Sequence, residues 1–234
     1  MPCTQRKPLS CVHHVPIFKG LDASIVEHIE KVISHNRFNK NEHLFYEGDP
    51  SSALYIIHKG IIKIYKLTED GKEQTVRLLF PGDFFGQSAL VVKNKHSINA
   101  QVLDDAEICI IDQAHFIHMM NKHPEIVLRM FTAINERLHE TDDWMTTISQ
   151  KETEQRLAKL LILFHKKLNI KENSFFQLPF AKKELAPLIG STRETVSRKL
   201  TKLVQNGIIE TNPQREFKIV NAEKLAAITG EYTT

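Results

Sequence analysis

At Gly190-Ser-Thr-Arg-Glu-Thr-Val-Ser-Arg-Lys-Leu200 the chain sorts its polar and apolar side chains onto two faces of one predicted helix. Ser191 and Glu194 have the Ser-x-x-Glu spacing of a capping box, which predicts that the helix begins at Ser191. One face is apolar and is expected to pack inward: Val196, Leu200, Leu203 and Val204. The other face is polar and is expected to be presented to a partner: Arg193, Glu194, Ser197, Arg198 and Thr201.

The residues around this helix predict a winged helix-turn-helix domain over residues 151–234. An apolar helix is expected over 156–165, and a further helix ends at Gly190, the break that a helix-turn-helix needs. Residues 208–220 have the pattern of two short strands turned at Asn212-Pro213, which would form the wing.

In this context the chemistry of the polar face suits DNA. An arginine fork matches the O6 and N7 acceptors of guanine, and a glutamate accepts a hydrogen bond from cytosine N4. We therefore predict that four side chains read bases: Arg193, Glu194, Ser197 and Arg198. The alternative is a solvated face on which Glu194 and Arg198 form an ion pair at i, i+4.

The chain before this domain predicts an antiparallel β-roll over residues 21–123, which makes the fold class α+β. A helix is expected over residues 24–33. From Glu42 to Phe116, short β-rich runs are separated by turn signals, of which Asp70-Gly71 is a hairpin signal.

A long helix is predicted over residues 124–150, with polar residues 148–153 as the hinge. Apolar residues, with one threonine layer, follow each other there at steps of four and three: Val127, Phe131, Ile134, Leu138, Thr141, Met145 and Ile148. This heptad seam predicts a parallel two-helix dimer. The alternative is an amphipathic helix that lies on its own domain.

Composition sets broad limits on the function. The 234 residues, 41% of them apolar, suit two domains. The net charge is +3, but residues 149–234 carry 15 Lys and Arg against 9 Asp and Glu, which weakly favours a polyanionic partner. No run is apolar enough for a membrane span or a signal peptide, so a cytoplasmic protein is expected. No nucleophile-base constellation or phosphate-cradling loop is present in the sequence, so an enzyme is not expected.

The order of these three parts, with Ile189-Gly190 ahead of Arg193-Glu-Thr-Val-Ser-Arg-Lys-Leu200, resembles the Crp/Fnr family of bacterial transcription regulators over essentially the whole chain. The resemblance implies a homodimer that binds an inverted repeat in double-stranded DNA, with RNA polymerase as a further partner. It also implies that the four polar residues named above read each half-site. Arg193 resembles the cyclic-AMP receptor branch and Ser197 the oxygen-sensing branch, so the half-site stays open between TGTGA-like and TTGA-like.

The resemblance also locates the segments that hold a cyclic nucleotide in the first of these branches, here residues 82–90 and 96–100. Gln87 stands where that branch has a glutamate, and His96 stands where it has an arginine. A buried phosphate without its bidentate cation loses charge-assisted hydrogen bonds, so cyclic AMP is not expected to bind. A different small effector in the roll stays the alternative.

Three cysteines are candidates for a redox response: Cys3 and Cys11 in a predicted arm over residues 1–20, and Cys109 in the roll. The oxygen-sensing branch holds an iron-sulphur cluster on several amino-terminal cysteines and one roll cysteine, which Cys109 matches. This chain is one cysteine short of the usual four ligands, which leaves a histidine or a carboxylate as the fourth. No cofactor is therefore expected, and the metal question stays open.

The segment at residues 11–18 most closely resembles the FNR-like (Flp-type) proteins of Gram-positive bacteria. That resemblance implies a dithiol-disulfide switch with Cys11 and Cys109 as the expected pair. The alternative for Cys109 is a buried core thiol with no functional partner.

Overall fold

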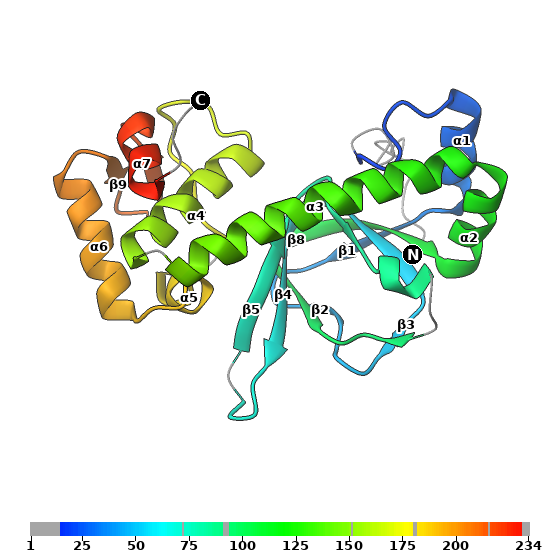
Figure 1. The fold of residues 1–234 in the computed structure, drawn as a ribbon, viewed down its shortest axis with the longest axis horizontal. Helices are drawn as coiled ribbons and strands as arrows, with labels where there is room; N and C mark the ends of the chain where they lie inside the picture. The colour runs from blue at the N-terminus through cyan, green and yellow to red at the C-terminus, as the bar shows by residue number, and fades with distance from the viewer. Residues whose placement is uncertain are drawn as a thin grey trace. The chain divides into compact units, whose positions relative to one another are not determined.

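The computed structural model describes residues 15–71, 73–90, 94–150, 152–179, 182–214 and 216–230 (Figure 1). The chain divides into two compact units: Met1–Lys66 with Val76–Leu138, and Leu67–Thr75 with His139–Thr234. Among the described helices, none combines the length and the apolarity that crossing a membrane requires.

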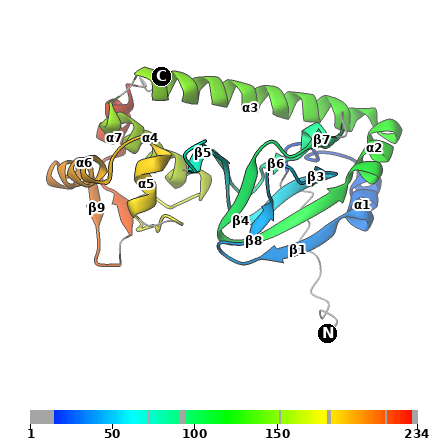
Figure 2. The ribbon, with the colours of Figure 1, turned by 90° about the horizontal axis from the view of Figure 1, so that it is seen from below.

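The first unit is the predicted antiparallel roll. Its elements in chain order are α1 (Ala23–Val32), β1 (Ser34–Phe38), β2 (His43–Phe45), β3 (Pro50–Ser51), β4 (Ala53–Leu67), β5 (Glu73–Leu79), β6 (Phe84–Phe85), the 3-10 helix η2 (Gln87–Leu90), β7 (Asn94–Lys95), β8 (Asn99–Asp112) and α2 (Gln113–Lys122). The main sheet has the order β1-β8-β4-β5, with β2 on β8 and β6 on β4, and β3 pairs with β7 (Figure 2). β4 and β5 are neighbours joined through Asp70-Gly71, which confirms the predicted hairpin.

The long strands β4 and β8 carry two hydrophobic clusters. Leu54 and Ile56 belong to one cluster and Ile57 to the other, because successive side chains of a strand point to opposite faces. The register between the strands shifts around Gly60, whose φ is +90°. A Cβ at Gly60 would lie 2.7 Å from the backbone of Ala106, so the close approach of the strands requires glycine here.

The helix α3 (Pro124–Gln150) follows the roll, and its 27 residues match the predicted range. Its first residue is a proline, which fits the first turn of a helix because no partner for its missing N–H is needed there. The next helix, α4 (Thr153–Lys167), begins three residues after Gln150, so the helical break falls within the predicted hinge.

The second unit contains the predicted winged helix. After α4 come α5 (Lys182–Leu188), α6 (Arg193–Gln205), β9 (Ile209–Thr211), β10 (Phe217–Ile219) and α7 (Ala222–Thr229). β9 and β10 pair antiparallel, with Thr211 opposite Phe217, and Asn212 lies in the connecting turn. Helix α4 extends beyond the predicted 156–165 at both ends, and α7 was not predicted.

Candidate nucleic-acid interface and sensor site

The residue that caps the start of helix α6 lies one position later than predicted, at Thr192 instead of Ser191. Gly190 has a φ of +58°, and the amide of Ser191 donates to the carbonyl of Ala186 at 2.9 Å. Together with the Gly190 amide, which donates to Pro187, this bond closes the carboxyl end of α5 as a Schellman motif. The Ser191 amide therefore ends the preceding helix, and the predicted Ser191–Glu194 capping box is wrong.

The cap of α6 is instead Thr192, whose backbone is extended at φ −93° and ψ 157°. Its hydroxyl accepts a hydrogen bond from the amide of Thr195 at 3.3 Å, which satisfies one free donor of the first turn. The Ser191 hydroxyl lies 3.3 Å from that of Thr153 on α4. The end of α5 and the start of α6 are thus fixed by consecutive residues, which sets the turn between the two helices.

The two faces of α6 separate as predicted, with one exception. Val196, Leu200 and Leu203 are buried at 4% exposure or less, but Val204 is 38% exposed, so its predicted inward position is wrong. The polar face is exposed throughout: Arg193, Glu194, Ser197, Arg198 and Thr201. Within the described part of the chain, Glu194 and Arg198 form no ion pair with each other, so the predicted i, i+4 pair is absent. Base reading by this exposed face stays a prediction, and so does the solvated face.

A carboxylate on α4 holds the flank of α6. Glu154 accepts hydrogen bonds from Lys199 at 2.8 Å and from Lys202 at 3.1 Å, and its side chain is only 13% exposed. The hydrogen bond from Lys199 lowers the pKa of Glu154 below its usual value, with a further contribution from Lys202. These two lysines therefore anchor the helix, and the four predicted base-reading residues stay available. No sequence pattern predicts this contact, because Glu154 lies in another helix.

Helix α3 has one apolar face on the roll and another exposed. Ile126, Met130 and Ala133 are buried in the cluster that contains Cys109. In the predicted seam, three side chains are exposed: Val127 at 47%, Phe131 at 63% and Leu138 at 57%.

The remaining seam residues behave differently. Ile134 is partly buried against the roll, so it lies at the border between the buried and the exposed face of α3. The side chains of Thr141, Met145 and Ile148 lie outside the part of the helix whose side chains the structure describes. The first turns of α3 therefore pack on the roll and still expose three residues of the seam. The dimer and its alternative both stay predictions.

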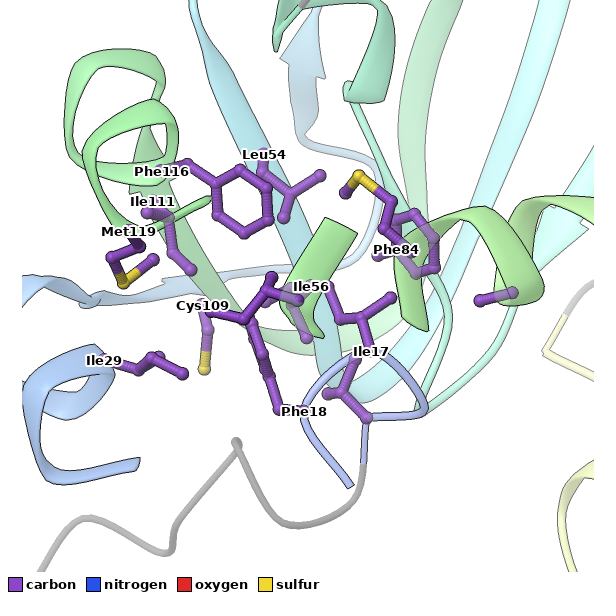
Figure 3. Close-up of a cluster of buried hydrophobic side chains, with 14 of the residues drawn as sticks. Ile17, Phe18, Ile29, Leu54, Ile56, Phe84, Cys109, Ile111, Phe116 and Met119 are labelled. Carbon is purple, nitrogen blue, oxygen red and sulfur yellow. The ribbon is translucent and has the colours of Figure 1, made fainter. Parts of the chain in front are cut away.

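Cys109 lies in the core of the roll at 1% exposure, with its sulphur directed toward Ile29 and Phe18 (Figure 3). His35 is opposite Cys109 in the β1–β8 register, and its Nδ1 is 3.5 Å from the sulphur. The sulphur is disulfide-bonded. Cys109 is the one cysteine among the described residues; Cys3 and Cys11 lie outside them, and so does the predicted Cys11–Cys109 pair.

The described residues bring together no group of three or more His, Cys, Asp or Glu side chains that could hold a metal. The predicted shortage of cluster ligands depends on Cys3 and Cys11, so it stays a prediction.

The roll also contains the positions predicted to lack a cyclic-nucleotide contact. His96 is 8% exposed and stacks on Phe45, with ring centroids 3.5 Å apart and planes 8° apart. Burial lowers the pKa of His96, which favours the neutral imidazole. Among the described residues of the roll, three buried side-chain atoms have no hydrogen-bond partner: Ser51 Oγ, Gln87 Oε1 and His96 Nε2. All three groups are polar, and His96 lacks the permanent positive charge that an arginine would offer to a phosphate at that position.

Comparison with known families agrees with both halves of this architecture. Residues 35–123 match the model of the cyclic nucleotide-binding domain, and residues 155–228 match that of the Crp-like helix-turn-helix domain. Among solved structures, FixK2 from Bradyrhizobium japonicum has a TM-score of 0.75 at 22% identity, covering 86% of this chain and 100% of that chain. This likeness confirms the predicted fold.

Curated relatives carry the comparison to function. The chain is 28% identical over 198 residues to the cyclic AMP receptor protein of Thermus thermophilus, covering 85% of this chain and 89% of that protein. It is 29% identical over 189 residues to the transcriptional activatory protein AadR of Rhodopseudomonas palustris, covering 80% of this chain and 78% of that protein. The chain belongs to the Crp/Fnr family and is a DNA-binding transcription regulator rather than an enzyme.

Proposed function

We propose that this regulator is a homodimer that reads an inverted-repeat DNA site through α6 and changes its DNA affinity when its cysteines are oxidised. The observation that carries the DNA-reading part is the exposed polar face of α6. Its lysines at 199 and 202 are bonded to Glu154, whereas Arg193, Glu194, Ser197 and Arg198 are exposed. A helix held this firmly on one flank can present its other side chains to base edges in a fixed orientation.

The test of base reading is Arg198→Ala. If the guanidinium forks onto guanine, the substitution should cost about 1 to 3 kcal/mol on the cognate site and relax discrimination at one base pair. Fluorescence anisotropy on cognate and random duplexes measures both effects. The matched control is Arg37→Ala, which removes an arginine of 84% side-chain exposure from the roll and should leave DNA binding unchanged. An equal loss on both duplexes would make Arg198 a phosphate contact and contradict the proposal.

The homodimer is supported by the exposed part of the α3 seam. Val127, Phe131 and Leu138 are large apolar side chains on one stripe of a helix whose opposite face is already buried. A second copy of the same stripe would remove them from water, which favours association. Two-fold symmetry then requires two half-sites with centres about one helical turn apart. As a transcription regulator bound beside a promoter, the dimer would contact RNA polymerase.

The oxidation response is supported by the disulfide-bonded, buried sulphur of Cys109. We assign Cys11 as its partner on the resemblance to the FNR-like proteins of Gram-positive bacteria. On oxidation, the two thiols lose two protons and two electrons as the S–S bond forms. A small-molecule disulfide accepts the two protons and the two electrons and is thereby reduced to two thiols.

Anaerobic purification tests this response. We expect a colourless protein that loses two free thiols on mild oxidation and changes its DNA affinity at the same time. Cys11→Ser and Cys109→Ser should each remove the change, whereas Cys3→Ser should keep it. A brown protein with iron and labile sulphide would instead identify a cluster.

A second candidate function is control by a small effector in the roll, and the three buried polar atoms without partners support it. Because burial favours neutral His96, we propose an uncharged polar effector. Cyclic AMP and adenosine share the base and the ribose. The difference between the melting-temperature shifts that they cause therefore reports the effect of the phosphate. A larger stabilisation by cyclic AMP would contradict a neutral site. An effector-dependent DNA affinity that persists with all three cysteines replaced by serine would favour this candidate over the redox response.

A further inference from the structure

A turn at residues 15–20 belongs to the core cluster around Cys109 and is hydrogen-bonded to helix α3. Val15, Ile17 and Phe18 are each at most 1% exposed and belong to the same cluster as Cys109. Figure 3 shows Phe18 beside Cys109 and Ile17 on the far side of Phe18, and the Phe18 ring packs on Phe116 of α2 at a centroid distance of 6.4 Å. The turn is thus buried against the sulphur, so a change at the sulphur would alter its packing.

The same turn is bonded to α3 through one side chain. Arg129 donates from Nη1 to the carbonyl of Lys19 and from Nη2 to the carbonyl of Gly20, the second bond being 3.1 Å long. A guanidinium can bridge two consecutive carbonyls because its donors form a rigid fork, which a lysine lacks. Gly20 has a φ of +74°, a conformation that glycine adopts without strain and that turns its carbonyl within reach of Arg129.

Arg129 lies within two residues of the seam residues Val127 and Phe131. In the same helix, Ile126 and Met130 pack into the cluster with Phe18 and Cys109. One short segment of α3 therefore touches the turn through both its apolar face and Arg129, and exposes the seam on its other side.

We infer that the turn at residues 15–20, clamped by Arg129, relays the oxidation state of Cys109 to the dimer seam of α3. This inference rests on the proposed redox response. Opening or closing the disulfide at Cys109 changes the packing of the sulphur against Phe18. The turn shifts with Phe18, and Arg129 transmits the shift to the helix segment that carries Val127 and Phe131. Arg129 is a positioning residue and takes no part in thiol chemistry.

The test is Arg129→Gln, compared with the control Arg37→Gln in the roll. The ratio of DNA affinities between oxidised and reduced protein should collapse in Arg129→Gln and persist in the control. The loss of two thiols on oxidation should be unchanged in both variants, because the disulfide itself is intact. Arg129→Lys, which keeps the charge and loses the fork, should recover only part of the ratio.

Trypsin provides a readout of the clamp that does not depend on redox. Lys19 is exposed and its carbonyl is held by Arg129, so cleavage after Lys19, followed by mass spectrometry, should be faster in Arg129→Gln than in the control. An unchanged cleavage rate would overturn the clamp. Faster cleavage with a full redox ratio would overturn the relay.

A wild-type protein whose DNA affinity ignores oxidation would overturn the proposed redox response, while the cleavage assay still tests the clamp. If Arg129→Gln does not fold, Phe18→Leu loosens the turn from within and should reduce the same ratio. If Phe18→Leu kept the wild-type ratio of DNA affinities between oxidised and reduced protein, although cleavage after Lys19 became faster, the relay would be overturned as well.

Discussion

Helices α3 and α6 are both two-faced, but their exposed faces differ in chemistry. Each buries one apolar stripe against its own unit, with Ile126 and Met130 on α3 and Val196 and Leu200 on α6. The exposed face of α3 is apolar, whereas that of α6 carries arginine, glutamate and hydroxyl groups. Apolar surface gains by burial against a like surface, and fixed donors and acceptors gain by pairing with base edges.

This difference explains why burial alone does not predict a helix's role. The buried stripes maintain the fold of each unit, and the exposed stripes select the partner. Changes to the buried stripe should therefore affect stability, and changes to the exposed stripe should affect association.

The largest effect is expected from Phe131→Asp. Phe131 is 63% exposed in the single chain, so the substitution should spare the fold and place a charge in the dimer seam. A monomer reaches one half-site at a time, so DNA affinity should fall by about 10²- to 10⁴-fold. Sedimentation and anisotropy measure the two losses. Thr132→Asp adds the same charge just outside the seam and should remain dimeric; a dimeric Phe131→Asp protein would disprove the seam.

The next effect separates the faces of α6. Leu203 is fully buried, and Leu203→Ala should lower the free energy of unfolding by about 2 to 5 kcal/mol. Its neighbour Val204 is 38% exposed, so Val204→Ala should change stability by less than about 0.5 kcal/mol. Denaturant unfolding gives both values. Similar losses in the two variants would mean that the helix packs in a different rotation.

A smaller effect is expected at Glu154, which anchors α6. Its pKa is lowered in the folded chain, so its stabilisation is present above the unfolded value of about 4.3 and is lost as the pH falls through the folded value. Glu154→Gln should cost about 1 kcal/mol at neutral pH. The difference from wild type should shrink below about pH 4. A difference that is constant across this pH range would rule out the ionised pair as its cause.

The sequence predicted the elements whose patterns are local. The helix that begins at Pro124 and the turn at Asp70-Gly71 are both present in the structure, because helical and strand periods decide which side chains share a face. Val127, Phe131 and Leu138 are exposed on that helix, but Ile134 packs on the roll. The prediction from the sequence was wrong where the end of one helix and the start of the next could use the same residue. Ser191 has the spacing of a cap, but its amide closes α5, so Thr192 caps α6.

Contacts between distant segments had no sequence signal. Glu154 meets Lys199 across 45 residues, and Arg129 meets Lys19 across 110. His96 was predicted only as a missing cation. Its stacking on Phe45 and the burial that lowers its pKa follow from the packing of the roll.

In the proposed complex, two copies of the chain, joined through α3, each place one α6 in a half-site. The most direct test is a titration of an inverted-repeat duplex whose half-site centres are one helical turn apart, beside a duplex with about five base pairs inserted between the half-sites. We expect two chains per duplex on the first, and a large loss of affinity on the second because the half-sites then face opposite sides of the helix. One chain per duplex, or equal affinity for both duplexes, would contradict it.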